Sequence, residues 1–332
     1  MNTAQGNMDK LLFSLTLIGS GLALGYLLQQ LDRASIISLP LPLIGLRKLL
    51  QKIGLLFFMP VSFLAAVWTV SFDNLRVALL PVIGTTALIG GGLLGLLFAR
   101  ILNKPAEQRA VLFCCGSFSN LGAIGSLICF MFLGEAGFAL VALYRMIEEI
   151  YYYAVGFPLA RFISGSHKAH QSLGRRLVTV LTDPFVAAAL SAFFIGLSLN
   201  LTGIARPPVF IPITAWFVPA GTFVLIVSIG LGMRFSGIRA SLVESLGVSL
   251  IKCLAVPLFS LLFAYLCGLH RIDGGLPFKV VLVLSAMPVA FNALVAASIY
   301  DLDLDLANSC WLMSTSTLLV VIPGLYLLLR GF

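Results

Sequence analysis

The chain has 332 residues, of which 60% are hydrophobic and only 10% are charged, and its mean hydropathy is +1.06. This composition is too apolar for a soluble protein of this length, so it excludes the soluble classes and indicates a lipid bilayer. The formal net charge of +8 would suggest nucleic acid as a partner of a soluble protein. In a membrane protein the distribution of charge among the loops matters more, and we expect no nucleic-acid partner.

Apolar runs long enough to span a bilayer recur along the chain and are continuous rather than alternating, which favours helices over a β-barrel. The predicted fold class is all-α, a polytopic membrane protein with ten spanning helices. A polar, basic connector, residues 164–176, separates two groups of five, residues 1–163 and 177–332. The expected spans lie near residues 11–30, 50–70, 77–99, 110–133, 137–163, 178–200, 211–232, 241–267, 279–299 and 308–329.

Lys and Arg residues are distributed unequally between the two sides of this topology. Thirteen fall in the odd-numbered loops and their flanks, against six at the termini and in the even-numbered loops. Because cytoplasmic loops carry the excess of positive charge, we expect both termini on the non-cytoplasmic side of the inner membrane, with the connector in the cytoplasm. The first apolar run is long enough to span, so we expect no cleaved signal peptide.

The two groups of spans resemble each other weakly. Phe58-Met-Pro60-Val in the second span matches Phe217-Val-Pro219-Ala in the seventh, and Leu24-Gly25 in the first matches Ile195-Gly196 in the sixth. Five spans per copy make the second copy enter the membrane from the opposite side, so we expect two inverted five-helix repeats. Pro60 and Pro219 are candidate hinges. Chance similarity between apolar segments is the alternative.

Two stretches interrupt apolar runs with helix-breaking residues and an asparagine, Gly116-Ser-Phe-Ser-Asn120-Leu-Gly122 and Ala286-Met-Pro288-Val-Ala-Phe-Asn292. A backbone group without a partner costs several kcal/mol inside a membrane, and paired broken helices are the best pointer to a substrate site near its midplane. We expect the two breaks to face each other in spans 4 and 9, with Pro288 freeing a carbonyl and Asn292 one turn later on the same face. The alternative is close helix packing with asparagine as interhelical glue. The candidate substrate-binding residues are Gly116, Asn120, Gly122, Pro288 and Asn292.

Four ionisable residues fall within predicted spans. Arg145, Glu148 and Glu149 share span 5, where spacings of three and four let the arginine meet either carboxylate, and Lys252 lies halfway along span 8. Charges at such depth tend to be paired and functional, so these residues are candidates for coupling to a proton or sodium gradient. We expect Lys252 to neutralise the remaining carboxylate. A purely structural charge cluster is the alternative.

Phe118-Ser-Asn120-Leu-Gly122-Ala-Ile-Gly125 resembles the fourth-span signature of the auxin efflux carrier family, and Ala286-Met-Pro288-Val-Ala-Phe-Asn292-Ala resembles its ninth-span counterpart. The resemblance implies inverted repeats similar to bile-acid and sodium/proton antiporter folds. It also implies a scaffold from spans 1, 2, 6 and 7, a mobile core from spans 3–5 and 8–10, and substrate at the crossing of spans 4 and 9. Ser126, where many relatives have proline, and the short connector point to a bacterial-type member, whose substrates are typically small organic acids.

We therefore predict a secondary active transporter that moves a small organic anion, a carboxylate, by alternating access, driven by a proton or sodium gradient or electrogenically. A membrane-embedded receptor or sensor with the same binding site is the alternative. No intramembrane histidine, HExxH or P-loop pattern occurs, which disfavours an enzyme or an ATP-driven pump. We expect no catalytic residues, metal or cofactor. The expected partners are the anion, lipids and a coupling proton or sodium ion, with a homodimer as an open alternative.

Overall fold

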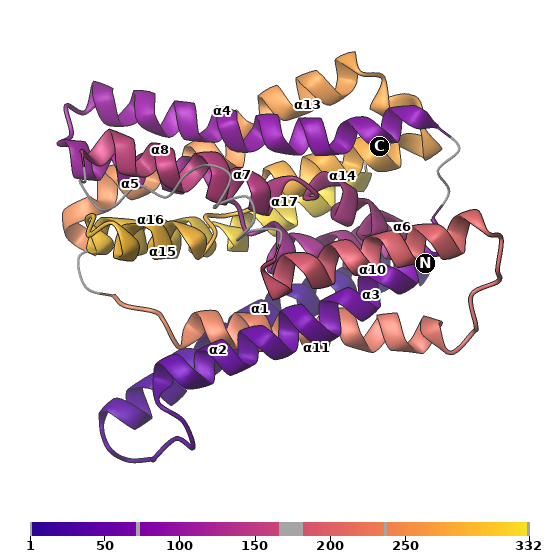
Figure 1. The fold of residues 1–332 in the computed structure, drawn as a ribbon, viewed down its shortest axis with the longest axis horizontal. Coiled ribbons are helices and arrows are strands. Elements are labelled where there is room, and N and C mark those ends of the chain that lie inside the picture. The colour runs from indigo at the N-terminus through magenta and orange to yellow at the C-terminus, as the bar shows by residue number, and fades with distance from the viewer. Residues whose placement is uncertain (1, 71–73, 166–181, 236–237, 331–332) are drawn as a thin grey trace. The chain divides into compact units, whose positions relative to one another are not determined.

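The computed structural model describes residues 2–70, 74–165, 182–235 and 238–330, and this part of the chain forms helices joined by turns, without a β-strand (Figure 1). The expected all-α fold class is confirmed. Among these residues, seven helical segments are long and apolar enough to cross a membrane, and a bent pair, Leu304–Ser316 with Leu318–Leu329, adds an eighth. The protein is polytopic, and the count of ten spans stays a prediction.

The second span begins earlier than the sequence suggested. It runs over Leu43–Val67 rather than from about residue 50. Its first part is helix α2 (Leu43–Ile53), which includes the basic residues Arg47, Lys48 and Lys52. Long basic side chains can lie along apolar surface while their charged ends reach water, so they do not terminate a membrane helix. The seven helical segments are Met8–Arg33, Leu43–Val67, Leu75–Ile101, Leu121–Ser164, Pro184–Leu201, Phe210–Gly230 and Ile238–Leu266.

The segment Leu121–Ser164 covers 44 residues and is too long for one span. At 1.5 Å per residue it would extend about 66 Å, roughly twice the thickness of the hydrocarbon core. Within helix α6 (Ser126–Tyr144), Gly134 has φ 72° and ψ −166°, a conformation that only glycine adopts readily. The helix is thus interrupted where the sequence analysis places the boundary between spans 4 and 5.

Three π-helical turns have a common cause in proline. The turns η1 (Gly54–Phe58), η4 (Tyr152–Gly156) and η6 (Ile251–Ala255) each end two residues before a proline, at positions 60, 158 and 257. Proline has no N–H to donate and its ring clashes with the carbonyl four residues back, so the ladder of hydrogen bonds shifts register at this point. Spans 2, 5 and 8 therefore each contain a local irregularity that the sequence explains.

The chain divides into two compact units. Unit 1 comprises Met1–Asp73, Gly122–Ala142 and Pro184–Met233. Within it α1 packs along α11, and α10 packs along α3 (Figure 1). Its helices are α1 (Asn2–Arg33), α2, α3 (Met59–Val67), most of α6, α10 (Pro184–Leu201) and α11 (Phe210–Gly230), with η3 (Leu121–Gly125) leading into α6.

The two glycines that the sequence pairs across the repeats make matching contacts in unit 1. A Cβ on Gly25 in span 1 would lie 2.2 Å from the carbonyl oxygen of Val227 in span 7, and a Cβ on Gly196 in span 6 would lie 2.7 Å from that of Leu64 in span 2. In the expected repeats, span 1 corresponds to span 6 and span 7 corresponds to span 2. The contact between spans 1 and 7 is therefore equivalent to the contact between spans 6 and 2, as two equivalent repeats would produce. The inverted repeat itself stays a prediction.

Unit 2 comprises Asn74–Leu121, Leu143–Asp183 and Arg234–Phe332. Helix α4 packs closely along α5, and α13 packs on α4 and α14 (Figure 1). Its α-helices are α4 (Leu80–Ile101), α5 (Ala106–Ser117), α7 (Glu148–Tyr151), α8 (Phe157–Ser164), α12 (Leu242–Leu250), α13 (Val256–Leu266), α14 (Leu276–Ser285), α15 (Asn292–Ile299), α16 (Leu304–Ser316) and α17 (Leu318–Arg330). The short turns η2 (Leu75–Leu79), η5 (Ile238–Ser241), η7 (Leu269–Arg271) and η8 (Asp273–Gly275) join some of them.

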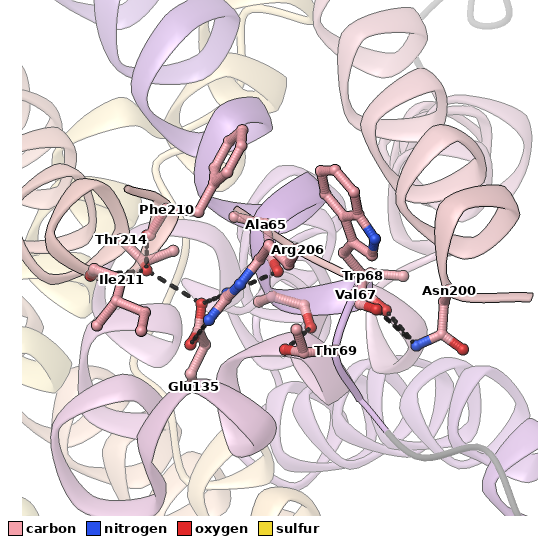
Figure 2. Close-up of polar contacts among 11 residues, drawn as sticks. Ala65, Val67, Trp68, Thr69, Glu135, Asn200, Arg206, Phe210, Ile211 and Thr214 are labelled. Carbon is pink, nitrogen blue, oxygen red and sulfur yellow. Dashed lines mark hydrogen bonds and ion pairs between the residues drawn. The ribbon is translucent and has the colours of Figure 1, made fainter. Parts of the chain in front are cut away.

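The residues Gly122–Ala142 pack within unit 1, although the sequence analysis assigned all of spans 4 and 5 to the mobile core. A polar cluster helps to hold them there. The guanidinium of Arg206 pairs with both carboxylate oxygens of Glu135, with Nη2–Oε2 at 3.0 Å, and Nη1 also donates to the carbonyl of Ala65 at 2.9 Å (Figure 2). The Thr214 hydroxyl lies 3.0 Å from the same carboxylate. This Glu135–Arg206 cluster ties the turn after Gly134 to the end of span 2 and to the chain before span 7.

Next to this cluster, Asn200 closes the end of span 2. Its amide nitrogen lies 2.8–3.2 Å from the carbonyl oxygens of Val67, Trp68 and Val70. Figure 2 shows Asn200 directed at Val67 and Trp68. The last carbonyls of a helix have no partner within the helix, so an asparagine from span 6 satisfies groups that would otherwise need water. The scaffold and core assignment stays a prediction, but unit 1 has its own polar ties between spans 2, 6 and 7.

Candidate functional site: the crossing of two broken helices

The two sequence breaks meet as a short antiparallel backbone crossing in unit 2. Ser119 and Val289 form an isolated antiparallel bridge, in which the Asn120 N–H donates to the Pro288 carbonyl at 2.9 Å and the Ala290 N–H donates to the Phe118 carbonyl at 3.0 Å. Each break therefore supplies the partners that the other lacks, which is how non-helical backbone can persist at membrane depth. The sequence analysis expected the breaks to face each other, and the bridge between Ser119 and Val289 shows that they do. The expectation that Pro288 frees a carbonyl stays a prediction.

The central residue of each break is held by a hydroxyl from another span. In a bridge of this kind the N–H and C=O groups of Ser119 and Val289 point away from each other. The Ser119 N–H donates to the Tyr152 hydroxyl at 3.0 Å, and the Val289 N–H donates to the Ser314 hydroxyl at 3.2 Å. The expected spans 5 and 10 contribute these hydroxyls, so the two breaks are supported in equivalent ways.

Pro288 and Asn292 do not share a helical face, which corrects the sequence analysis. Helix α14 ends at Ser285, residues 286–291 are non-helical, and Asn292 is the first residue of α15. A proline that lacks an N–H and restricts the residue before it ends the helix here instead of bending it. The Asn292 side chain is half-buried, and within the described part of the chain it forms no hydrogen bond. Asn120 is buried beside the crossing.

Gly116 is a packing residue. A Cβ on Gly116 in α5 would lie 2.3 Å from the Gly91 carbonyl oxygen in α4, and a Cβ on Gly91 would lie 2.3 Å from the Gly116 carbonyl oxygen. Two helices that approach this closely need glycine on both sides. For this residue the packing alternative explains the sequence. Gly122 lies in the π-helical turn η3, just after the crossing.

Lys252 is directed to the first break rather than to a carboxylate. Its side chain is buried, with 2% of the residue exposed, and Nζ donates to the Gly116 carbonyl at 3.2 Å and to the Ser119 hydroxyl. Among the described residues no ion pair joins it to a carboxylate, so Lys252 does not neutralise the remaining carboxylate by direct contact. The carbonyls at the C-terminal end of a helix carry partial negative charge and lack helical partners, which explains why a cation lies there.

The charges of span 5 form the expected cluster. Arg145 Nε lies 2.7 Å from Glu148 Oε2, and Arg145 Nη2 lies 3.7 Å from Glu149 Oε1. Glu148 is 4% exposed, and its other oxygen accepts a hydrogen bond from the Tyr152 hydroxyl at 2.9 Å. Because Tyr152 also contacts Ser119, one chain of contacts leads from Arg145 to the crossing.

The candidate hinges lie in unit 1. Pro60 follows the turn η1 as the second residue of α3, and Pro219 lies inside α11. The neighbouring rings of Phe58 and Phe217, which the sequence pairs as equivalent, contact each other edge to face with centroids 5.1 Å apart. Contact between equivalent residues is expected where a pseudo-twofold axis passes, so this position would be central to unit 1.

Several important residues were not selected from the sequence. Ser119 and Ser314 have a residue type that is frequent in membrane helices, and Tyr152 is one of three consecutive tyrosines, a pattern that packing alone can explain. Neither Glu135 nor Arg206 is among the candidate site residues that the sequence gives. The one available signal was Glu135, an isolated acid after a glycine between two apolar runs.

Comparison with known proteins gives two findings. Residues 46–326 match the family described as "Membrane transport protein". An uncharacterized transporter of Methanothermobacter thermautotrophicus is 28% identical over 251 residues, which cover 74% of this chain and 76% of the relative.

Proposed function

The chain belongs to the membrane transport protein family, that of the auxin efflux carriers, and from this premise we propose that it is a secondary active transporter for a small organic anion, a carboxylate. The protein is a transporter rather than an enzyme by family. Beyond family membership, we propose the substrate class, transport by alternating access and a binding site at the crossing. We also propose a location in the cytoplasmic membrane with both termini on the non-cytoplasmic side.

The observation that carries the proposal is the meeting of two unwound segments beside a buried cation. Main chain at this depth is tolerated where it is buried in protein or lines a cavity, and transporters bind substrate at such interruptions. The free amide of Asn292 lies at the start of α15, where the helix dipole favours negative charge. The Lys252 ammonium lies at the other break with neutral partners. A carboxylate would satisfy both the amide donor and the fixed positive charges.

The proposal is tested first by binding. We would measure the melting temperature of the purified protein with acetate, lactate, succinate and malate, with and without sodium and at two pH values. A ligand present at a hundred times its Kd stabilises the folded state by about 2.7 kcal/mol, so a substrate should raise the melting temperature clearly. If none of these carboxylates stabilises the protein while a neutral or cationic compound does, the anion assignment is wrong.

A receptor or sensor would bind ligand at the same site without releasing it on the other side. Counterflow distinguishes the two functions: proteoliposomes are loaded with the stabilising carboxylate in unlabelled form, and uptake of the labelled compound from outside is measured. Exchange across the membrane supports the carrier, and binding without exchange supports the receptor.

A further inference from the structure

The Tyr152 hydroxyl has two acceptors but only one hydrogen. Its oxygen lies 2.9 Å from Glu148 Oε1 and 3.3 Å from the carbonyl oxygen of Ser119, and it also accepts the Ser119 N–H at 3.0 Å. A phenolic hydroxyl can donate to one acceptor at a time. An ionised carboxylate is the stronger acceptor, because hydrogen bonds to charged groups are about twice as strong as neutral ones.

We propose that Tyr152 is a positioning residue that switches between Glu148 and the backbone of the first break according to whether Glu148 carries a proton. With Glu148 ionised, the phenol donates to the carboxylate. When a proton from the aqueous phase binds Glu148, the carboxylic acid donates to the phenolic oxygen, and the phenolic hydrogen turns to the Ser119 carbonyl. Tyr152 itself gains and loses no proton. The switch itself does not depend on the proposed transport function. Only its role in coupling protonation to transport rests on that function.

The charges around Glu148 determine the net charge that protonation leaves beside the crossing. Arg145 pairs with Glu148 and Glu149, Lys252 lies on Ser119, and Asp183 lies within electrostatic range of Glu149. Arg145, Lys252, Glu148 and Glu149 sum to zero when all are ionised, so protonation of Glu148 leaves this group with one net positive charge. Arg145 keeps Glu149 as a partner, so it is not stranded.

A net positive charge beside the crossing attracts an anion, and an anion at the crossing in turn favours protonation, because the coupling between two binding events is reciprocal. Proton and carboxylate would therefore bind together, as in a symporter. The hydroxyl transmits the same event to the backbone. The Ser119 carbonyl already accepts from the Leu121 N–H at 2.9 Å, and it gains the phenol as a second donor when Glu148 is protonated.

The chain offers two matched controls. Tyr151 is the neighbouring buried tyrosine, and its hydroxyl pairs with Ser117 at 2.9 Å rather than with a carboxylate. Ser314 holds the second break through the Val289 N–H, and its hydroxyl lies 3.1 Å from the Trp311 carbonyl rather than near a charge. Both support buried structure near the crossing, but neither contacts Glu148.

The test is hydrogen–deuterium exchange of the intact protein in lipid nanodiscs without substrate, compared at about pH 4 and about pH 8. After correction for intrinsic rates, the segment 118–121 of the wild type should exchange about fivefold more slowly at the lower pH, as expected for one additional hydrogen bond. Tyr152→Phe should abolish this pH dependence. Tyr151→Phe and Ser314→Ala should keep it, even if they exchange faster overall.

Glu148→Gln provides a second, independent variant, because glutamine cannot take up a proton and should make exchange independent of pH. If Tyr152→Phe does not fold, the Glu148→Gln variant tests the switch by itself. Absence of pH dependence in the wild type, or its persistence in either variant, would overturn the switch. Because no substrate is used, this outcome is separate from the carboxylate screen, which can fail or succeed by itself.

Discussion

Lys252 shows how one side chain at the residue scale supports the crossing. Its partners are the Gly116 carbonyl at the end of α5 and the Ser119 hydroxyl, both within the first break. Hydrogen bonds from charged groups contribute about 1.5–3 kcal/mol, and their loss would leave a helix end without a donor.

We expect Lys252→Met to lower the free energy of unfolding by about 2–3 kcal/mol, measured by thermal or denaturant unfolding in detergent. Lys52→Met on the exposed side of α2 is the control and should have little effect. Because Lys252 contacts no carboxylate directly, Glu148→Gln should not rescue it. Rescue in the double variant would contradict the observed contacts.

Substitution of Asn292 should affect ligand binding much more than the stability of the fold. Its amide is half-buried and free of hydrogen bonds within the described residues. We expect Asn292→Ala to change the unfolding free energy by less than about 1 kcal/mol, while it weakens carboxylate binding about tenfold, the effect of one lost charge-assisted hydrogen bond. Ligand titrations that follow the melting temperature give both quantities.

Asn120→Ala should abolish transport, and because the Asn120 side chain is buried beside the crossing, we also expect some loss of stability. Normal uptake by both variants at normal abundance would favour interhelical packing as the role of the two asparagines.

At this scale the sequence predicts the costly residues and misses their partners. Helix breakers and charges in apolar runs stand out because each has an energetic cost in a membrane. The two serines, Ser119 and Ser314, carry no such cost, since a serine hydroxyl can bond nearby backbone, and the phenol of Tyr152 is attached to an apolar ring. The role of each hydroxyl therefore depends on which distant group lies opposite. The sequence also did not predict which groups the Lys252 side chain contacts, for the same reason.

At the scale of elements, the Glu135–Arg206 cluster makes a measurable connection. Arg206 pairs with Glu135 and also donates to the Ala65 carbonyl, so its two contacts tie the turn after Gly134 to the end of span 2. The Glu135 side chain is 26% exposed, so solvent screens part of the attraction.

A double-mutant cycle with Glu135→Gln and Arg206→Gln should give a coupling energy of about 1 kcal/mol in unfolding. Arg206→Gln alone should cost more than Glu135→Gln, because it also removes the donor to Ala65. Strictly additive effects would mean that the ion pair contributes nothing to the stability of unit 1.

Elements were predicted well where proline or glycine determines them, and less well where charge was used as a boundary. The breaks before Asn120 and at Pro288 and the turn near Gly134 follow from backbone chemistry. The start of span 2 at Leu43 was missed because basic residues were taken as its limit. The tie from Arg206 to Glu135 could not be predicted, since the two residues are far apart in the sequence.

For the whole molecule, orientation is the most direct prediction. The thirteen-to-six distribution of Lys and Arg predicts that both termini lie on the non-cytoplasmic side. A reporter active only outside the cytoplasm, fused after Phe332, should be active, and a cytoplasmic reporter at this position should be silent. The same pair of reporters inserted in the connector at Gly174 should give the opposite result. Cytoplasmic activity at Phe332 would reverse the proposed topology.

The antiparallel crossing also sets an order of events during biosynthesis. The Phe118 carbonyl and the Asn120 N–H find their partners at Ala290 and Pro288, and these residues leave the ribosome about 170 residues later. At about 5–20 residues per second, the first break waits roughly 10–30 seconds in the membrane with its main-chain groups incomplete. During this interval the nascent chain depends on lipid headgroups, water or the insertion machinery to shelter it, and a truncated first half would be a target for quality control.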